Sequence, residues 1–481
     1  MKLSDILSSK DFYCKSNSTD VEIKKISTSF EITGKDTLFV SLKGDKDAEA
    51  AAIKSGCAAI LCDVENRDYS IPVIHTQNLR IAYAELCFKL SGFDRTKTKL
   101  IGVTGTNGKT SVARTIYSIL NACNHKCGFI GTADIELPEI KLSKRFYSMT
   151  TPDPELLYPT LKTMQELECE YAVMEVSSHS LYFEKLRPLN FAVSVFTNLS
   201  AEHLDFHKSI SEYFDTKKKI AEISDQMIIN VDDYYGKMLY DEYRGKKIGV
   251  GALYESDVTL KNVKTKGFDG IEYLYYTNDY VFRASSRLCG IFNVYNTALA
   301  LAAVIRLGIL PCSAKEALSK SAVIPGRFQV ISNEPTIVID YAHTPVGFEN
   351  FLKSLSYAAH GRKIRLLFGC GGDRDKKKRP DMARAAEKYA TKIYVTSDNP
   401  RSESPEDIIK DILAGFSDKA EYRVIPNRCE AIYAIIAEAA PDEIIAIVGK
   451  GEEPYIIDKD GYHPHSDSDC AINAIKNKKR D

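Results

Sequence analysis

The chain has 481 residues, with 64 Lys and Arg against 65 Asp and Glu, so its formal net charge is -1. Proteins that coat nucleic acids or anionic membranes need an excess of positive charge, so this balance argues against both kinds of partner. Hydrophobic residues make up 44% of the chain and charged residues 27%, which is typical of a globular protein. At about 100–200 residues per domain, the length predicts about three domains.

The sequence shows no sign of export or membrane insertion. No apolar run follows the N-terminus, and the most apolar segment, 297–310, is interrupted by Arg306 and predicts a buried helix. We therefore expect a cytoplasmic protein whose 12 cysteines are reduced thiols. The cluster Cys123-Asn124-His125-Lys126-Cys127 lacks a second pair of ligands, so ordinary packing is favoured there over a metal site.

Along the first two thirds of the chain, short apolar runs alternate with helical patterns. Residues 1–95 form a small α/β unit, with strands expected at 37–41 and 58–62 and helices at 48–55 and 79–90. From residue 96, strands that alternate with helices predict a mostly parallel, doubly wound sheet. The expected strands are 99–104, 171–176, 192–197 and 227–231, and the segment 258–283 has the alternation of antiparallel hairpins.

A second change of pattern occurs at Pro325-Gly326-Arg327. Beyond it, apolar runs at 336–340, 364–368, 392–396 and 444–448 are separated by helical patterns, which predicts a Rossmann-like doubly wound unit. The predicted fold is thus α/β in three domains, 1–95, 96–325 and 326–481. Ligands of such sheets bind beyond the carboxyl ends of the strands, where most of the polar motifs lie.

The strongest local motif is a Gly-rich loop between a strand and a helix, Gly102-Val103-Thr104-Gly105-Thr106-Asn107-Gly108-Lys109-Thr110. In this context glycines let backbone N–H groups converge on phosphates, the lysine reaches the β- and γ-phosphates, and the threonine hydroxyl ligates Mg²⁺. The spacing departs from the strict phosphate-loop motif because Val103 replaces a glycine. We interpret the loop as a nucleoside triphosphate site; the alternative is a Gly-rich turn that only precedes a helix.

Three further patterns are compatible with metal or proton chemistry. Glu175 follows an apolar strand and could hold Mg²⁺, or simply cap the strand end. The segment 197–207 follows another strand and includes Glu202, His203, Asp205 and His207, which are candidate metal ligands or proton-transfer groups. The run Lys217-Lys218-Lys219 by itself is typical of a solvated helix face.

Taken together, these motifs resemble the Mur ligase family. The matching stretches are Gly105-Thr106-Asn107-Gly108-Lys109-Thr110-Ser111, Thr150-Thr151-Pro152, Glu175-Val176-Ser177-Ser178-His179, 198–207, Phe292-Asn293-Val294-Tyr295-Asn296, Asp340-Tyr341-Ala342-His343-Thr344-Pro345, Gly371-Gly372-Asp373-Arg374-Asp375, Asp398-Asn399-Pro400-Arg401 and Gly449-Lys450-Gly451. The resemblance implies an N-terminal UDP-binding domain, a central ATPase and a C-terminal domain that receives an amino acid. Each motif alone is weak evidence for the family, but the motifs occur along the chain in the same order as in the family.

The resemblance implies a reaction and its site residues. A substrate carboxylate attacks the γ-phosphate of ATP to give an acyl phosphate, and an incoming amine then displaces phosphate; Lys109 and two Mg²⁺ ions neutralise the charge. Thr110, Glu175, His203 and a carbamylated Lys217 would hold the ions. The ATP site would comprise Gly105, Thr106, Asn107, Gly108, Lys109, Thr110, Ser111, Asn293, Asn296, Arg327 and Asp340, and the UDP-muramyl dipeptide would contact Ser29, Thr150, Thr151 and Ser177.

The stretch Asp398-Asn399-Pro400-Arg401 resembles the family signature for meso-diaminopimelate. This amino acid has a second carboxylate at its far end, which a planar guanidinium binds bidentately and which lysine lacks. The resemblance adds Arg374, Gly449 and Glu453 to the pocket, with Glu453 suited to the far ammonium. Alternatively, Arg401 could pair with a nearby acid such as Glu403 or Glu406.

The sequence departs from the family at a few positions. Gly449-Lys450-Gly451-Glu452-Glu453 has Glu452 where a histidine is usual, Asn427 replaces an aspartate before Arg428, and Ser27-Thr28-Ser29-Phe30 replaces an Asp-Ser-Arg signature. We expect a monomeric ligase of small-molecule substrates that adds diaminopimelate to UDP-N-acetylmuramoyl-L-Ala-D-Glu in peptidoglycan precursor synthesis. A folate-polyglutamate-type or secondary-metabolite ligase and a non-catalytic scaffold are the alternatives.

Overall fold

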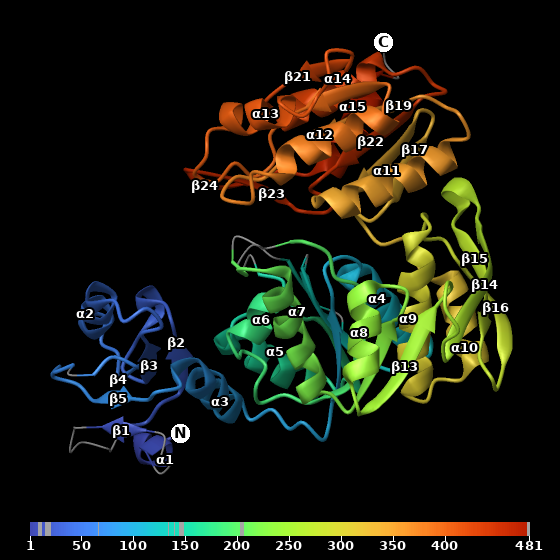
Figure 1. Ribbon diagram of the computed structural model, residues 1–481. Coiled ribbons are helices and arrows are strands. Elements are labelled where there is room, and N and C mark those ends of the chain that lie inside the picture. Colours follow the sequence, from blue (N-terminus) through green and yellow to red (C-terminus); the bar gives the residue numbers. More distant parts are fainter. Residues whose placement is uncertain are drawn as a thin grey trace. The chain divides into compact units, whose positions relative to one another are not determined.

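The computed structural model describes residues 1–7, 12–14, 21–65, 67–132, 134–138, 140–143, 149–202 and 206–478 (Figure 1). The chain forms two compact units. The first comprises Met1–Gly102, His125–Ala192 and Thr216–Asp225, and the second comprises Val103–Asn124, Val193–Asp215 and Gln226–Asp481. This division follows contacts within the chain, so the domain boundaries expected near residues 95 and 325 stay predictions.

The first unit begins with a small five-stranded sheet in the order β1-β5-β4-β3-β2. All neighbouring strands are parallel except β1 and β5. The helices and strands are α1 (Leu3–Leu7), β1 (Tyr13–Cys14), β2 (Lys25–Ser27), β3 (Thr37–Val40), α2 (Lys46–Lys54), β4 (Ala59–Cys62), β5 (Val73–His75) and α3 (Leu79–Ser91). The predicted strands and helices of residues 1–95 are therefore confirmed. Phe39, Ile60 and Ala52 contribute to the core between the sheet and α2.

An eleven-stranded sheet contributes strands to both units, in the order β16-β15-β14-β13-β12-β11-β6-β10-β7-β8-β9. Its middle is parallel, whereas β14 to β16 and β7 to β9 pair antiparallel, which confirms the predicted hairpins at 258–283. The strands are β6 (Lys99–Thr104), β7 (Cys127–Ile130), β8 (Asp134–Leu137), β9 (Ile140–Ser143), β10 (Tyr171–Glu175), β11 (Phe191–Phe196), β12 (Gln226–Asn230), β13 (Lys246–Gly251), β14 (Val258–Thr265), β15 (Ile271–Tyr276) and β16 (Val281–Ser286).

Helices separate most of these strands, and the three strands β6, β10 and β11 each lead directly into a predicted motif. The helices are α4 (Lys109–Ala122), α5 (Pro154–Glu166), α6 (Ser178–Tyr182), α7 (Ile210–Lys218), α8 (Tyr234–Glu242), α9 (Phe292–Arg306) and α10 (Pro311–Lys320). The run of residues from Asn296 to Val304 in α9 is buried, so the apolar segment near 297–310 is a core helix, as expected. Among the helices that the structure describes, none is long and apolar enough to cross a membrane.

The C-terminal part of the second unit is a six-stranded sheet in the order β17-β18-β22-β19-β20-β21, parallel except for β17 (orange and red in Figure 1). Leu366 and Phe368 face helices α11 to α13, whereas Leu367 faces α14 and α15. Successive side chains of the strand thus point to opposite faces of the sheet, and helices cover both faces, as expected of a Rossmann-like unit. The elements are β17 (Gln329–Asn333), β18 (Thr336–Asp340), α11 (Pro345–Ala359), β19 (Ile364–Phe368), α12 (Lys378–Tyr389), β20 (Lys392–Val395), α13 (Pro405–Leu413), β21 (Tyr422–Val424), α14 (Arg428–Glu438), β22 (Ile444–Val448), β23 (Tyr455–Asp458), β24 (Gly461–Pro464) and α15 (Asp467–Lys478).

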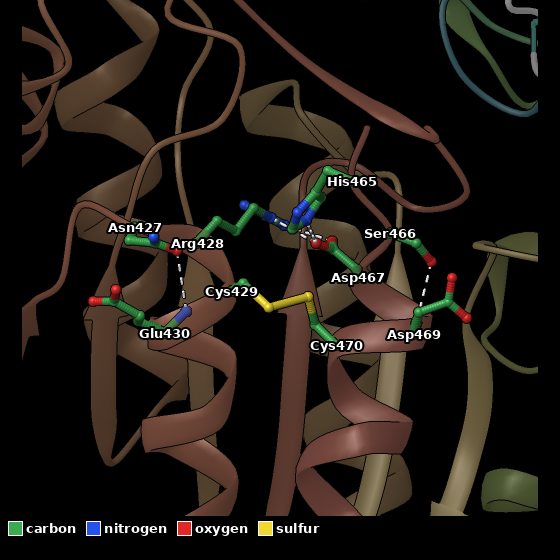
Figure 2. Close-up of a disulfide and its surroundings, with 9 residues drawn as sticks. All are labelled: Asn427, Arg428, Cys429, Glu430, His465, Ser466, Asp467, Asp469 and Cys470. Carbon is green, nitrogen blue, oxygen red and sulfur yellow. Dashed lines mark hydrogen bonds and ion pairs between the residues drawn. A yellow bond between two sulfur atoms is a disulfide. The ribbon is translucent and has the colours of Figure 1, made fainter. Parts of the chain in front are cut away.

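The expectation that every cysteine is a reduced thiol is wrong for one pair. Cys429 at the start of α14 and Cys470 on α15 form a disulfide (Figure 2), with Cα atoms 5.8 Å apart. Sequence reasoning missed the pair because the two residues are 41 positions apart, and only the packing of α14 against α15 brings them within bridging distance. The remaining cysteines are thiols.

Beside the disulfide, a buried ion pair joins the same two helices. The guanidinium of Arg428 donates from Nε and Nη2 to the two carboxylate oxygens of Asp467, both at 2.7 Å, and neither side chain is exposed (Figure 2). Arg428 Nη2 also donates to the carbonyl of Val448, at 3.1 Å. Burial alone would raise the pKa of Asp467, but Arg428 and His465 outweigh it and hold that pKa below its usual range.

Removing one partner of this ion pair should destabilise the protein strongly. Asp467→Asn leaves the Arg428 charge buried without its counter-ion, so we expect a loss of about 3–5 kcal/mol in the free energy of unfolding near pH 7. Because the pKa of Asp467 is lowered on folding, its contribution is complete above about pH 4, declines below it and vanishes below the folded-state pKa. The wild type and the variant should therefore converge in acid.

Denaturant titrations at several pH values measure this difference. Asp469→Asn is the matched control, because Asp469 lies in the same first turn of α15 but is exposed (Figure 2). An Asp467→Asn protein as stable at pH 7 as the Asp469→Asn protein would contradict the structural role given to the pair.

Candidate functional site

The Gly-rich loop after β6 adopts a conformation that needs its glycines. Gly108 has φ +86°, and a Cβ there would lie 2.5 Å from Oδ1 of Asn296. A Cβ on Gly105 would lie 1.9 Å from Oγ1 of Thr197. The loop therefore passes so close to neighbouring side chains that only glycine fits, as expected of a loop whose N–H groups must converge on a ligand.

Two residues at the end of β11 hold this loop. The Thr197 hydroxyl and the Asn198 amide both donate to the carbonyl of Asn107, at 2.6 and 3.0 Å, and Asn198 Oδ1 accepts the Asn107 N–H. Lys109 at the start of α4 donates to the carbonyls of Gly105 and Thr106, at 3.0 and 2.8 Å. The first two residues of the 197–207 segment thus shape the Gly-rich loop, while the chemistry predicted for Glu202, His203, Asp205 and His207 stays a prediction.

The other expected ATP residues surround the same loop. Thr110 and Ser111 lie buried in the first turn of α4. Arg327 donates from Nη2 to Oγ1 of Thr110 at 2.9 Å. Asn293 and Asn296 are buried on one face of α9 and bond each other, the Asn296 amide donating to Asn293 Oδ1 at 2.8 Å. These predicted residues thus lie around the N-terminus of α4. The positive end of a helix dipole attracts an anion such as a phosphate.

Asp340 at the end of β18 has a structural task. Its two carboxylate oxygens accept the backbone N–H groups of Phe328 and Ala342, both at 2.7 Å. Burial raises its pKa, opposed by the charge of Arg327 and by these hydrogen bonds. The carboxylate thereby fixes the position of Phe328 and so of its neighbour Arg327. The contact with a ribose stays a prediction.

A second polar cluster belongs to the first unit and contains Glu175. This carboxylate is fully buried and accepts the N–H and the hydroxyl of Thr132, at 2.9 and 2.8 Å. Thr151 donates to the Glu175 carbonyl at 2.8 Å and lies 3.3 Å from the Ser177 hydroxyl, while Thr132 lies 3.2 Å from the Thr150 hydroxyl. The four predicted residues, Thr150, Thr151, Glu175 and Ser177, thus lie close together. Thr132 was missed, although its place just after β7 was an available signal.

The N-terminal segment near Ser29 reaches the same region of the first unit. The backbone N–H and the hydroxyl of Thr28 donate to the carboxylate of Glu155, at 2.8 and 3.1 Å. Glu155 lies in the first turn of α5, shortly after Thr151. Lys185, which sequence reasoning did not single out, is buried beside this turn and pairs with Asp153 at 2.7 Å.

The lysine run on α7 has one buried member. The side chain of Lys217 is 1% exposed, whereas Lys218 and Lys219 are partly exposed and Lys219 pairs with Glu184. The solvated-face interpretation therefore does not hold for Lys217. The predicted ligand His203 lies outside the described residues, and Thr110 belongs to the second unit while Glu175 and Lys217 belong to the first, so their joint metal site stays a prediction.

The expected amino-acid pocket is a buried polar cluster in the C-terminal sheet. The fully buried ammonium of Lys450 donates to Oδ1 of Asn399 at 2.9 Å and to Oε2 of Glu453 at 3.1 Å. The Asn399 amide donates to the same Glu453 oxygen at 2.9 Å. Asp398 lies 3.7 Å from Lys450. Burial alone would raise the pKa of Asp398, but the charges of Lys450 and Arg428 together outweigh burial and lower that pKa. Gly449, with φ +117°, lets Asp398 approach, because a Cβ there would be 2.9 Å from the carboxylate.

Arg401 does not form the alternative ion pair considered for it. Its Nη1 donates to the carbonyl of Gly372 at 2.7 Å, whereas Glu403 pairs with the buried Arg379 at 2.9 Å. The hydrogen bond from Arg379 lowers the pKa of Glu403 to about 2, against the opposing effect of burial. Arg374, in the adjoining loop, is exposed. Both predicted arginines thus lie on loops at the carboxyl ends of strands of one sheet.

Tyr341 belongs to the motif at 340–345 without being a predicted site residue, yet it contacts residues of two predicted sites. Its hydroxyl donates to Oε1 of Glu453 at 3.1 Å, and the Arg327 guanidinium lies 4.1 Å above its ring. Asn427, which stands where the family has an aspartate before Arg428, caps α14, since its Oδ1 accepts the N–H of Glu430 (Figure 2).

Two family models match the chain. The Mur ligase middle domain matches residues 103–304, and the Mur ligase, glutamate ligase domain matches residues 326–451. A "UDP-N-acetylmuramoyl-L-alanyl-D-glutamate--2,6-diaminopimelate ligase" of Clostridioides difficile is 35% identical over 99% of this chain and 99% of its own length. A ligase of the same name from Aquifex aeolicus is 37% identical over 93% of this chain and 92% of its own length.

Solved structures agree with these relatives. A structure of a "UDP-N-acetylmuramoyl-L-alanyl-D-glutamate--2,6-diaminopimelate ligase" superposes with a TM-score of 0.68 at 25% identity, covering 100% of this chain and 99% of its own. A MurF ligase from Thermotoga maritima in complex with ADP shares the fold, with a TM-score of 0.63 at 17% identity over 95% of this chain and 98% of its own. The motifs, the sheets and these likenesses together show that the chain belongs to the Mur ligase family.

Proposed function

We propose that this protein is an ATP-dependent ligase that adds meso-2,6-diaminopimelate to UDP-N-acetylmuramoyl-L-alanyl-D-glutamate during peptidoglycan precursor synthesis. Relatives with that name match it over nearly the full length. The observation that carries the choice of amino acid is the cluster of Asn399, Lys450 and Glu453 beside Arg401. Glu453 supplies a carboxylate and Arg401 a guanidinium, which suits an amino acid whose far end carries both an ammonium and a carboxylate.

The phosphate loop supports the first step. The substrate carboxylate attacks the γ-phosphorus of ATP, ADP leaves, and an acyl phosphate forms. Both reactants are anionic, so cations must lower the cost of their approach. Lys109, at the N-terminus of α4, and Arg327, which is within hydrogen-bond distance of Thr110, supply positive charge there. Asn293 and Asn296 would border the adenine, and Asp340 the ribose.

The second step joins the amino acid. Its free amine attacks the carbonyl carbon of the acyl phosphate, phosphate leaves with the bonding electrons, and the amine loses a proton. Asp398, Asn399, Arg374, Arg401, Gly449 and Glu453 would orient the diamino acid so that only one amine reaches the carbonyl. Ser29, Thr150, Thr151 and Ser177 would hold the UDP-muramyl dipeptide, and three of these four lie together around Glu175.

The proposed activity includes two Mg²⁺ ions. A threonine hydroxyl and a buried carboxylate are hard oxygen ligands of the kind Mg²⁺ prefers, so Thr110 and Glu175 would hold one ion and His203 the other. Magnesium would neutralise the phosphate charge. Lys217 would join the second ion as a carbamate, an anion in place of an ammonium. The burial of Lys217, in contrast to its two neighbours, supports this assignment.

Replacing Lys109 should stop the reaction. We expect Lys109→Ala to lower kcat/KM by about a hundredfold or more, because it removes a cation from the developing phosphate charge. The measurement is ADP release that depends on both UDP-muramyl dipeptide and diaminopimelate. Lys126→Ala, at an exposed lysine beyond the end of α4, is the control. Near-wild-type activity of Lys109→Ala would refute the phosphate role.

Replacing Lys217 should give an enzyme that a small acid can rescue. Lys217→Ala removes the carbamate, so we expect no detectable ADP release without added acid and partial recovery with millimolar to molar acetate or formate. Lys218→Ala, the adjacent and partly exposed residue, should keep wild-type activity and show no response to acid. A fully active Lys217→Ala enzyme would rule out the carbamate.

Replacing Arg401 should change the choice of amino acid. Loss of a hydrogen-bonded charge pair costs about 1.5–3 kcal/mol, so Arg401→Ala should lower kcat/KM for diaminopimelate by about 10- to 100-fold. Activity with lysine, which has no distal carboxylate, should change little. Arg384→Ala, at an exposed position of α12, is the control. An unchanged preference for diaminopimelate over lysine would assign Arg401 a purely structural role.

A further inference from the structure

Tyr341 occupies the first position after β18, between two sets of residues that the proposed function separates. On one side lies the nucleotide loop, and on the other lies the amino-acid pocket. A Cβ on Gly451 would lie only 2.9 Å from the Tyr341 Cβ, so the two backbones are in close contact. This contact fixes the base of the tyrosine side chain against the loop that carries Lys450 and Glu453.

The ring of Tyr341 supports the nucleotide side. The Arg327 guanidinium carbon lies 4.1 Å from the ring centroid, a cation–π contact, and the same guanidinium donates to Thr110 Oγ1 at 2.9 Å. A flat ring beneath a planar guanidinium limits the orientations that the guanidinium can take. The ring therefore helps to aim Arg327 at the phosphate loop.

The hydroxyl of Tyr341 supports the amino-acid side. It donates to Oε1 of Glu453 at 3.1 Å, while Oε2 of Glu453 accepts from Asn399 and Lys450. Three donors thus hold one carboxylate in a fixed orientation. Tyr341 therefore contacts both Glu453 and Arg327.

We propose that Tyr341 is a positioning residue for the amino-acid pocket, whose hydroxyl orients Glu453 toward the distal ammonium of the diamino acid while its ring supports Arg327. The inference rests on the proposed function. It separates two roles within one side chain, so substitutions that remove only the hydroxyl and those that also remove the ring should have different consequences.

Tyr341→Phe tests the hydroxyl with two acceptor amino acids. Diaminopimelate has the distal ammonium, whereas 2-aminopimelate keeps the reacting amine and the distal carboxylate but lacks it. We expect Tyr341→Phe to raise KM for diaminopimelate about tenfold. The value for 2-aminopimelate, measured as a substrate or as a competitive inhibitor, and KM for ATP should stay within about twofold. A loss common to both amino acids would overturn the inference.

Tyr341→Leu tests the ring, and should raise KM for ATP as well as for diaminopimelate. Tyr394→Phe is the matched control, because the Tyr394 hydroxyl also donates to a glutamate, Glu438, at 2.6 Å on β20 of the same sheet. It should leave both KM values unchanged; a selective rise there would overturn the inference.

Glu453→Gln provides a second test in case Tyr341→Phe does not fold. Glu453→Gln should show the same selective loss with diaminopimelate, and adding Tyr341→Phe to it should cost less than about twofold more, because the hydroxyl acts through Glu453. If the effects of the two substitutions on KM were fully additive, the hydroxyl would not act through Glu453. If the wild type releases no ADP with diaminopimelate, the proposed function fails and this inference with it; a working wild type whose Tyr341→Phe variant is unaffected refutes only the inference.

Discussion

The register of the C-terminal parallel sheet is the constraint on which the proposed amino-acid pocket depends. Asp340 pairs with Val448, Val448 with Phe368, and Phe368 with Val395, so four strands end in one row. A slip of one residue would turn every side chain of a strand to the opposite face and shift the loop that follows. Because the strands end together, loops that are up to about a hundred residues apart in sequence begin at the same edge.

Fixed charges then give these loops their shape. The Arg428 guanidinium lies behind the strand ends and binds the carbonyl of Val448, Arg379 binds the carbonyl of Gly371, and Lys450 joins Asn399 to Glu453. Each of these cations is buried, and a buried charge is tolerated only with well-placed partners. Buried cations therefore organise the loops of the proposed pocket through bonds within the protein.

Much of this arrangement could be predicted from the sequence, because apolar period and motif order are local properties. The strand ends, the phosphate loop and the loop at Asp398 follow from such patterns. Other features depend on tertiary contacts between residues far apart in sequence. The anchoring of Asn107 by Thr197, the disulfide of Cys429 and the double contact of Tyr341 leave no trace in spacing alone. The burial of Lys217, in contrast to Lys218, likewise depends on tertiary packing, since both lysines lie in one charged run.

The partner of Arg428 comes from α15, the final helix of the described chain. During synthesis, the ribosome must therefore extend the chain past residue 467 before this arginine can be neutralised by Asp467. A nascent chain that stops before residue 467 would have every motif of the phosphate loop, but its amino-acid pocket would lack an anchor. Such a chain would leave the Arg428 guanidinium buried without its carboxylate partner, so the charge balance behind the strand ends depends on a helix that carries none of the predicted site residues.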